Sequence, residues 1–266
     1  MNSRDFDKTV YALRLVYRVG MLLVVGSLAA VAVTARAADF SVSPMIVEFQ
    51  RGVRSAEIQV RNLDKQPIRF QIRATDWSQD ASGKNIYADS KSLIWFPRAI
   101  ELAPDESRII RVGIRALPAT QEQAYMIFIT EVPLEGSRPE KAQGAQVQII
   151  LSVSVPIFVP PARAQPGGAV ESIELSGGSL NVVVANAGNR HFSYREAVVV
   201  GVDSEGAEKF RQTVRGKTLL AGSRHSLEVR IPSEACRQLR ELALTLTTSE
   251  KSAIKRRLDV SRAECE

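Results

Sequence analysis

Residues that usually carry catalysis or metal binding are scarce in this chain. Its 266 residues include only two histidines and two cysteines, and aromatic residues make up 6% of the sequence. His191 and His225 do not have the spacing that places paired metal ligands on one helix face. The sequence also lacks the G-x-S-x-G, G-x-x-x-x-G-K-S/T and strand-linked G-x-G-x-x-G motifs. We therefore expect no metal site, no cofactor and no enzymatic activity.

Long apolar runs are also missing after Ala38, so we expect no membrane-spanning helix in the remainder of the chain. At the N-terminus, basic residues within 1–18 precede an uncharged apolar run over 19–34 and then Ala35-Arg36-Ala37. This order predicts a secretory signal peptide over residues 1–37, with cleavage before Ala38. An uncleaved N-terminal anchor is the alternative. After cleavage we expect a soluble, exported protein without stable membrane insertion.

The chain has little net charge once the signal peptide is removed. Residues 1–37 hold five basic and two acidic residues, so cleavage lowers the net charge from +6 to about +3. The remaining basic residues are spread along the chain and form no dense tract that would bind a phosphate backbone. Nucleic acid is therefore not an expected partner.

The two cysteines, Cys236 and Cys265, both lie near the C-terminus. An even number of cysteines in an exported protein favours a disulfide, and two separate thiols are the alternative. A bridge closing a loop of about 30 residues would restrict the unfolded chain and stabilise the fold by about 3 kcal/mol.

Helical periodicity is scarce from Phe40 onward, and short apolar segments rich in Val, Ile and Phe dominate instead. The first series of expected strands is 40–48, 55–61, 67–76, 92–95, 107–115, 124–133 and 145–159. The second series is 169–174, 179–186, 195–202, 208–214, 224–230, 239–248 and 253–260. Seven strands at this spacing are typical of one immunoglobulin-like sandwich. Three short windows, 118–124, 233–241 and 249–257, could form at most one or two turns of helix.

Proline and glycine interrupt both series between Pro160 and Gly168, which predicts a linker. The fold class is therefore all-β, with two immunoglobulin-like β-sandwich domains joined at an angle by a short Pro/Gly-rich linker. The expected organisation is a signal peptide (1–37), an N-terminal domain (38–160), a linker (161–168) and a C-terminal domain (169–266).

Several segments resemble the periplasmic pilus (fimbrial) assembly chaperone family. Most specific is Trp95–Pro104 followed by Arg111-Val112, and Asn62 and Pro67 fit the family's N-x(4)-P spacing. Asn186-Ala187-Gly188-Asn189-Arg190-His191 is similar to the non-classical branch. Further similar segments are Phe40–Pro44, Tyr125–Phe128, Glu131–Pro133 and Gln146–Pro161.

This resemblance implies a periplasmic chaperone whose partners are pilin subunits and an outer-membrane usher. Such a chaperone binds a subunit by donor-strand complementation, in which it lends a strand to an incomplete sandwich. From Val147 to Ile157 the odd positions are all apolar and most even positions are polar, so one face of the expected strand is continuously apolar. The subunit-binding residues are expected to be Val147, Ile149, Leu151 and Val153. Val153 also begins the part of the strand, up to Ile157, that we expect to pack inward.

The resemblance has one departure. In the classical branch, two basic residues hold the C-terminal carboxylate of the subunit, but the corresponding positions here are Ile46 and Pro156. Neither side chain can bind a carboxylate. The candidates for this role are arginines, because a guanidinium binds carboxylates with two hydrogen bonds. They are Arg98, Arg190 and Arg195, and each could instead be an ordinary solvated arginine.

Glu131 matches a family position that joins a salt-bridge network between the domains. Its usual arginine partner is replaced here by Val159 or Pro160, which leaves its role open.

Two other functions fit the same fold. One is an exported β-sandwich adhesion or surface-structure component that donates no strand. The other is a secreted hydrolase or carbohydrate-binding sandwich, which would need clustered carboxylates or aromatic platforms that the sequence does not supply. Exposed strand edges also allow self-association.

Overall fold

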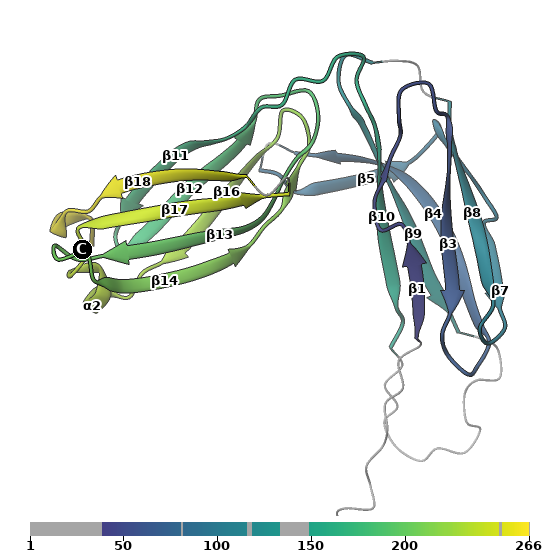
Figure 1. Ribbon diagram of the computed structural model, residues 1–266, viewed down its shortest axis with the longest axis horizontal. Coiled ribbons are helices and arrows are strands. Elements are labelled where there is room, and N and C mark those ends of the chain that lie inside the picture. The colour runs from purple at the N-terminus through teal and green to yellow at the C-terminus, as the bar shows by residue number, and fades with distance from the viewer. Residues whose placement is uncertain (1–38, 81, 116–118, 134–148, 250–251, 266) are drawn as a thin grey trace, which may run out of the picture. The chain divides into compact units, whose positions relative to one another are not determined.

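The computed structural model describes residues 39–80, 82–115, 119–133, 149–249 and 252–265 (Figure 1). The expected signal peptide and Val147 lie outside the described residues. Nearly all regular structure in the described part is β-strand, which confirms the expected all-β fold class. Both sandwiches fall within one compact unit of the chain. The angle between them and the limits of the linker stay predictions.

The N-terminal sandwich consists of two sheets. One has the order β1-β3-β8-β6, and the other has the order β2-β10-β9-β4-β5, with β7 also paired to β4. The strands of the first sheet are β1 (Phe40–Ser43), β3 (Ser55–Asn62), β8 (Ser107–Ile114) and β6 (Leu93–Phe96). Those of the second are β2 (Val47–Glu48), β10 (Ser152–Val159), β9 (Gln123–Val132), β4 (Ile68–Gln79), β5 (Asn85–Asp89) and β7 (Ala99–Leu102).

Alternating apolar residues of these strands form the core of the N-terminal sandwich. Successive side chains of a strand point to opposite faces, so each strand contributes every second residue to the interior. Among the fully buried side chains are Ile58, Phe70, Ile110, Ile127 and Ile157. The order of strands in the second sheet determines which edge of β10 is covered by a neighbouring strand.

The C-terminal sandwich also has two sheets, with the orders β11-β12-β16 and β14-β13-β17-β18; β15 pairs with β13. The strands of the smaller sheet are β11 (Gly168–Ser176), β12 (Ser179–Asn186) and β16 (Arg224–Arg230). Those of the larger are β14 (Glu208–Arg215), β13 (Phe192–Val202), β17 (Glu241–Thr248), β18 (Ala253–Asp259) and β15 (Thr218–Leu219).

A disulfide joins Cys236 to Cys265, as the sequence predicts. Cys236 ends the short helix α2 (Ser233–Cys236), and Cys265 ends the 3₁₀ turn η1 (Arg262–Cys265). Both sulfur-bearing side chains are buried in the core of the C-terminal sandwich. The bridge therefore ties the end of the chain to this core.

Several local predictions are wrong. The segment 40–48 is split into β1 and β2 around Pro44, because proline interrupts the ladder of hydrogen bonds. Strand β5 was not predicted, because all five of its side chains are exposed and give no alternating pattern. Strands β7 and β15 were also missed, and both are short. Of the helical windows, only 233–241 contains a helix; the described part of 118–124 leads into β9, and 253–257 belongs to β18.

No helix among the described residues is both long enough and apolar enough to cross a membrane.

Candidate functional site

Strand β10 has one edge that is fully paired and one that is largely open. Strand β9 pairs antiparallel with β10 from Ser152 to Val159. The Leu151 carbonyl accepts a hydrogen bond of 2.9 Å from the Glu131 N–H, which shows that odd-numbered residues direct their backbone groups toward β9. The even-numbered residues therefore direct theirs to the opposite edge.

Strand β2 covers only one end of that opposite edge. It pairs in parallel with Ile157 and Phe158 of β10, and the Phe158 carbonyl accepts a hydrogen bond of 2.9 Å from the Phe49 N–H. Within the described residues, no strand pairs with this edge between Ser152 and Pro156. The N–H groups of Ser152 and Ser154 are directed outward there, whereas Pro156 has no N–H. An edge of this kind can pair with a strand from another chain.

The apolar face of β10 changes from buried to exposed toward the start of the strand. Val155 and Ile157 are fully buried, as expected, and Val153 and Leu151 are half-buried. The Ile149 side chain is 47% exposed. Burial of the apolar residues of β10 therefore decreases toward the start of the strand, and Ile149 before it is exposed. The assignment of these residues to subunit binding stays a prediction.

The start of β10 differs from the prediction of a strand over 145–159. The regular strand begins at Ser152, and residues 149–151 are not assigned to it, although Leu151 keeps the hydrogen bond to β9. Residues 145–148 lie outside the described part of the chain.

The three candidate carboxylate anchors lie in different places. Arg98 follows β6, and its guanidinium lies over the Trp95 ring at 4.7 Å from the centroid. The Nη2 atom of Arg190 lies 3.8 Å from Oε2 of Glu48, a residue of β2. Arg195 is exposed on β13. Of the three, Arg190 is the one with an ion pair to the strand that borders the open edge of β10.

The two apolar residues at the expected anchor positions are neighbours at this edge. The register between β2 and β10 pairs Val47 with Ile157, and the preceding residues on each side are Ile46 and Pro156. Ile46 is 55% exposed, and Met45 beside it is 54% exposed. The place where the open edge meets β2 is therefore apolar.

Among the described residues, Glu131 forms no salt bridge. Its carboxylate Oε2 instead accepts a hydrogen bond of 3.3 Å from the Leu151 N–H. Glu131 thus contributes to holding the start of β10 against β9.

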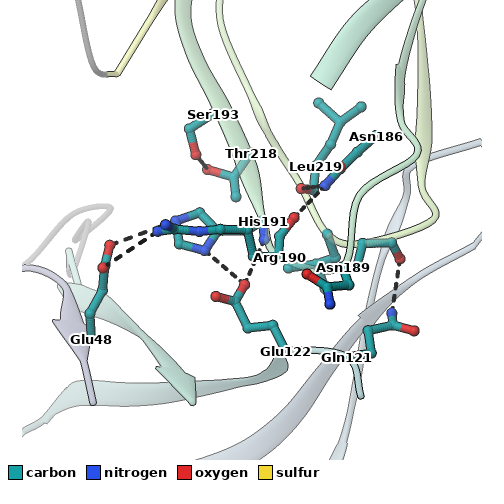
Figure 2. A network of polar contacts seen from close by, with 12 residues as sticks. Glu48, Gln121, Glu122, Asn186, Asn189, Arg190, His191, Ser193, Thr218 and Leu219 are labelled. Atoms are coloured by element: carbon teal, nitrogen blue, oxygen red, sulfur yellow. Dashed lines mark hydrogen bonds and ion pairs between the residues drawn. The ribbon is translucent and has the colours of Figure 1, made fainter. Parts of the chain in front are cut away.

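Around the other end of β10, a network of polar contacts joins residues of the two sandwiches (Figure 2). Glu122 Oε1 accepts hydrogen bonds from the His191 backbone N–H (2.6 Å) and contacts His191 Nδ1 (2.8 Å). His191 Nε2 lies 3.7 Å from Oε1 of Glu48. The side chains of Glu122 and His191 are 5% and 12% exposed. His191 is thus held between two carboxylates in a site with little access to water.

The turn between β12 and β13 supplies further contacts of this network. The Asn189 side-chain amide donates to the carbonyls of Thr120 (2.9 Å) and Arg163 (2.8 Å), and the Asn189 carbonyl accepts from the Glu122 N–H (2.8 Å). Outside this turn, Gln121 Nε2 donates to the carbonyl of Ala221, which follows β15, at 3.1 Å. Sequence reasoning used residues 186–191 only as a mark of resemblance and missed this role.

The network is packed directly against β10. The rings of Phe158 and His191 are stacked with centroids 3.8 Å apart. Phe158 also packs with Trp77, Met126 and Leu220 in one buried cluster. The end of β10 is therefore fixed by packing, whereas its start has the open edge.

In the described residues, no group of three or more His, Cys, Asp or Glu side chains comes together. His191 is engaged by Glu122, and His225 lies on β16. Burial lowers the pKa of His225 below its ordinary value, and the charge of Lys217 lowers it further.

Known proteins resemble the chain in sequence over its N-terminal part and in fold over most of its length. Residues 39–165 match the family described as "Pili and flagellar-assembly chaperone, PapD N-terminal domain". This is a family of chaperones and not of enzymes. No curated protein sequence matches the chain.

Solved structures with the same fold include three chaperone structures. One is a complex of the chaperone CsuC with the tip adhesion subunit CsuE, from archaic chaperone-usher Csu pili of Acinetobacter baumannii (16% identity, TM-score 0.52, covering 72% of this chain and 91% of the other). The CupB2 chaperone of Pseudomonas aeruginosa has 12% identity and a TM-score of 0.52, covering 83% and 100%. The YadV chaperone has 12% identity and a TM-score of 0.56, covering 84% and 100%. Identities this low show the shared fold alone.

Proposed function

We propose, from the membership of residues 39–165 in the family of pili and flagellar-assembly chaperones, that this protein is a periplasmic chaperone for pilin-like subunits. It binds a subunit along the open edge of β10 by donor-strand complementation. It then delivers the subunit to an outer-membrane usher. The proposal requires export by the expected signal peptide.

The observation that carries this proposal is the combination of an open edge on β10 and partly exposed apolar residues directly before and at the start of this strand. No strand among the described residues pairs with the outward N–H groups of Ser152 and Ser154, and just before β10 Leu151 is half-buried and Ile149 exposed. Main-chain bonds along an edge give affinity, and alternate side chains in pockets give specificity. Both elements of strand donation therefore occur together.

Strand donation stabilises a subunit whose own sandwich lacks a strand. Burial of an aliphatic side chain contributes about 1.5–3 kcal/mol, so two or three such residues supply a large part of the binding free energy before the entropic costs of association. A strand from a neighbouring subunit that fits better can then replace β10. This exchange needs no nucleotide and no metal.

The bordering strand β2 suggests how the end of the bound strand is held. A strand added along Ser152–Pro156 ends against the exposed apolar residues Met45 and Ile46. Arg190 is near β2, because its guanidinium lies 3.8 Å from the carboxylate of Glu48 on that strand. The Glu48 side chain is 56% exposed. We therefore assign the role of carboxylate anchor to Arg190 in preference to Arg98 and Arg195.

Co-purification tests the proposed function. The full-length chain is expressed with candidate pilin subunits, and complexes are isolated from the periplasm. The variant Ile149→Asp with Leu151→Asp is compared with Ile150→Asp, which changes a neighbouring side chain that is 53% exposed. We expect a stoichiometric complex with the wild type and with Ile150→Asp, and loss of the complex with the double variant.

Circular dichroism and thermal unfolding show whether each variant is folded. Failure of the wild type to capture any soluble subunit would favour an exported sandwich component that donates no strand. Capture by the folded double variant would contradict the assignment of the binding strand.

A further inference from the structure

A groove of about 650 Å³ lies on the N-terminal sandwich. Its lining comes from β4, from the end of β5 and the turn after it, from β6 and Arg98 beyond it, from Arg115 after β8 and from Thr130 on β9. Four basic residues are among the lining residues: Arg73, Lys91, Arg98 and Arg115. Asp89 is the one carboxylate among the lining residues. The groove therefore carries a net positive charge.

These four cations differ from four other arginines of the same sandwich. Arg61, Arg69, Arg108 and Arg111 each form an ion pair with a carboxylate. In the described part of the chain, no ion pair engages any of the four groove cations. All four residues are exposed. Their charges are available to a ligand.

Two of the guanidinium groups are already positioned by aromatic rings. Arg73 lies 4.9 Å from the centroid of Phe128, and Arg98 lies 4.7 Å from that of Trp95. Such cation–π contacts restrict the arginine side chain, so less conformational entropy is lost when a ligand binds.

Hydrogen bonds to backbone groups hold the walls of the groove. The Trp95 indole N–H donates to the Ile72 carbonyl at 3.1 Å, and the Arg98 carbonyl accepts from the Ile72 N–H at 2.8 Å. In the turn that carries Lys91, the Ser90 hydroxyl oxygen accepts hydrogen bonds from the Ser92 and Leu93 N–H groups. The groove is thus formed before any ligand binds.

We propose that this groove binds an acidic segment of a partner protein. Planar guanidinium groups match carboxylates in geometry, and the neutral polar groups of Gln71, Ser90 and Thr130 in the same lining suit the amides of a polypeptide. A groove of this volume is in the range of sites for small ligands or short peptide segments. The proposal does not depend on strand donation by β10.

The two tryptophans of the chain provide a direct test. Trp95 lines the groove, whereas Trp77 lies elsewhere and donates its indole N–H to Asn85 Oδ1. The exported protein is labelled with ¹⁵N and titrated at low salt with a ten-residue peptide of alternating Glu and Gly. We expect the Trp95 indole signal to shift in a saturable way while the Trp77 signal stays in place.

A charge-matched pair of variants separates a specific site from a general charge effect. Replacing Arg73→Gln with Arg98→Gln should raise the dissociation constant by about tenfold or more. Lys255→Gln with Arg256→Gln, two exposed residues of β18, removes the same charge and should leave it unchanged. The Ile149→Asp with Leu151→Asp variant should bind the peptide like the wild type, so failure here and failure of strand donation are distinguishable.

Several results would overturn the proposal. They are an unmoved Trp95 signal, equal shifts of both indoles, or equal weakening by the β18 variant. Binding of a Gln–Gly peptide with the same affinity would show that carboxylates do not contribute to binding. A response to inorganic phosphate or a heparin oligosaccharide without one to the peptide would assign the groove to phosphate or sulfate groups instead.

Discussion

At the scale of single residues, His191 contacts several other side chains, and no local sequence pattern predicts these contacts. Its backbone N–H and its ring contact Glu122, its ring is stacked on Phe158, and Glu48 faces its Nε2 atom. Since Phe158 belongs to β10 and His191 precedes β13, these contacts connect the proposed binding strand to the C-terminal sandwich. Glu122 is the residue whose removal should disturb this connection most.

Replacing Glu122→Ala should lower the free energy of unfolding by about 1–3 kcal/mol, because it leaves the His191 N–H without its acceptor in a site with little water. The control is Glu57→Ala, which removes a 55% exposed partner of Arg111 and should cost at most about 1 kcal/mol. Chemical denaturation of both variants measures the difference. Equal losses would show that the Glu122 contacts contribute no more than a surface ion pair.

Arg190 allows a second residue-scale prediction. If it holds the carboxylate of a bound subunit, Arg190→Gln should weaken the complex by about tenfold while the protein stays folded, since charged hydrogen bonds contribute about 1.5–3 kcal/mol. Arg195→Gln changes an exposed residue of β13, is the matched control and should not change the affinity. Surface plasmon resonance with purified subunit gives both values. An unchanged affinity for Arg190→Gln would leave the anchor unassigned.

At the scale of elements, the disulfide between α2 and η1 holds the end of the chain on the C-terminal core. The loop it closes spans a sequence separation of 29 residues. The two elements it joins have four residues each, too few for stable helices by themselves. Their position therefore depends on the bridge and on burial.

Replacing Cys236→Ala and Cys265→Ala together should destabilise the protein by about 2–5 kcal/mol. Thermal unfolding with and without reductant measures this effect. Reductant should lower the melting temperature of the wild type and leave that of the double variant unchanged. The same melting temperature for both proteins would contradict a stabilising role of the bridge.

Elements with a strong alternating pattern could be predicted from the sequence, and elements without one could not. Strand β3 has the pattern of an exposed and a buried face, and its expected limits were within one residue of the structure. Strand β5 has five exposed side chains and pairs only with β4, so nothing in its composition separates it from a loop. The break at Pro44 has a clear sequence signal, but apolar residues on both sides concealed it.

The candidate site could likewise be predicted only in part from the sequence. The apolar stripe from Ile149 to Ile157 follows from alternation alone, and its inner part is buried as expected. The open edge of β10 does not follow from the sequence, because it depends on how far β2 extends beside it. The Glu122–His191 contact joins residues 69 positions apart and could not be predicted from local patterns.

At the scale of the whole molecule, the central claim is that β10 completes the sheet of another protein through its outer edge. In the free protein, the Ser152 and Ser154 amides have no strand partner among the described residues, whereas those of Val153 and Val155 are directed toward β9. Formation of a complex by strand addition should protect the Ser152 and Ser154 amides from exchange and leave the protection of Val153 and Val155 unchanged. Contacts elsewhere on the surface would not produce this alternation.

Residue-resolved amide hydrogen exchange of the free protein and of its complex with a pilin subunit measures this alternation. We predict that exchange of the Ser152 and Ser154 amides slows by about 100-fold or more in the complex, while Val153 and Val155 are protected in both states. A stoichiometric complex in which Ser152 and Ser154 continue to exchange as in the free protein would contradict strand donation by β10.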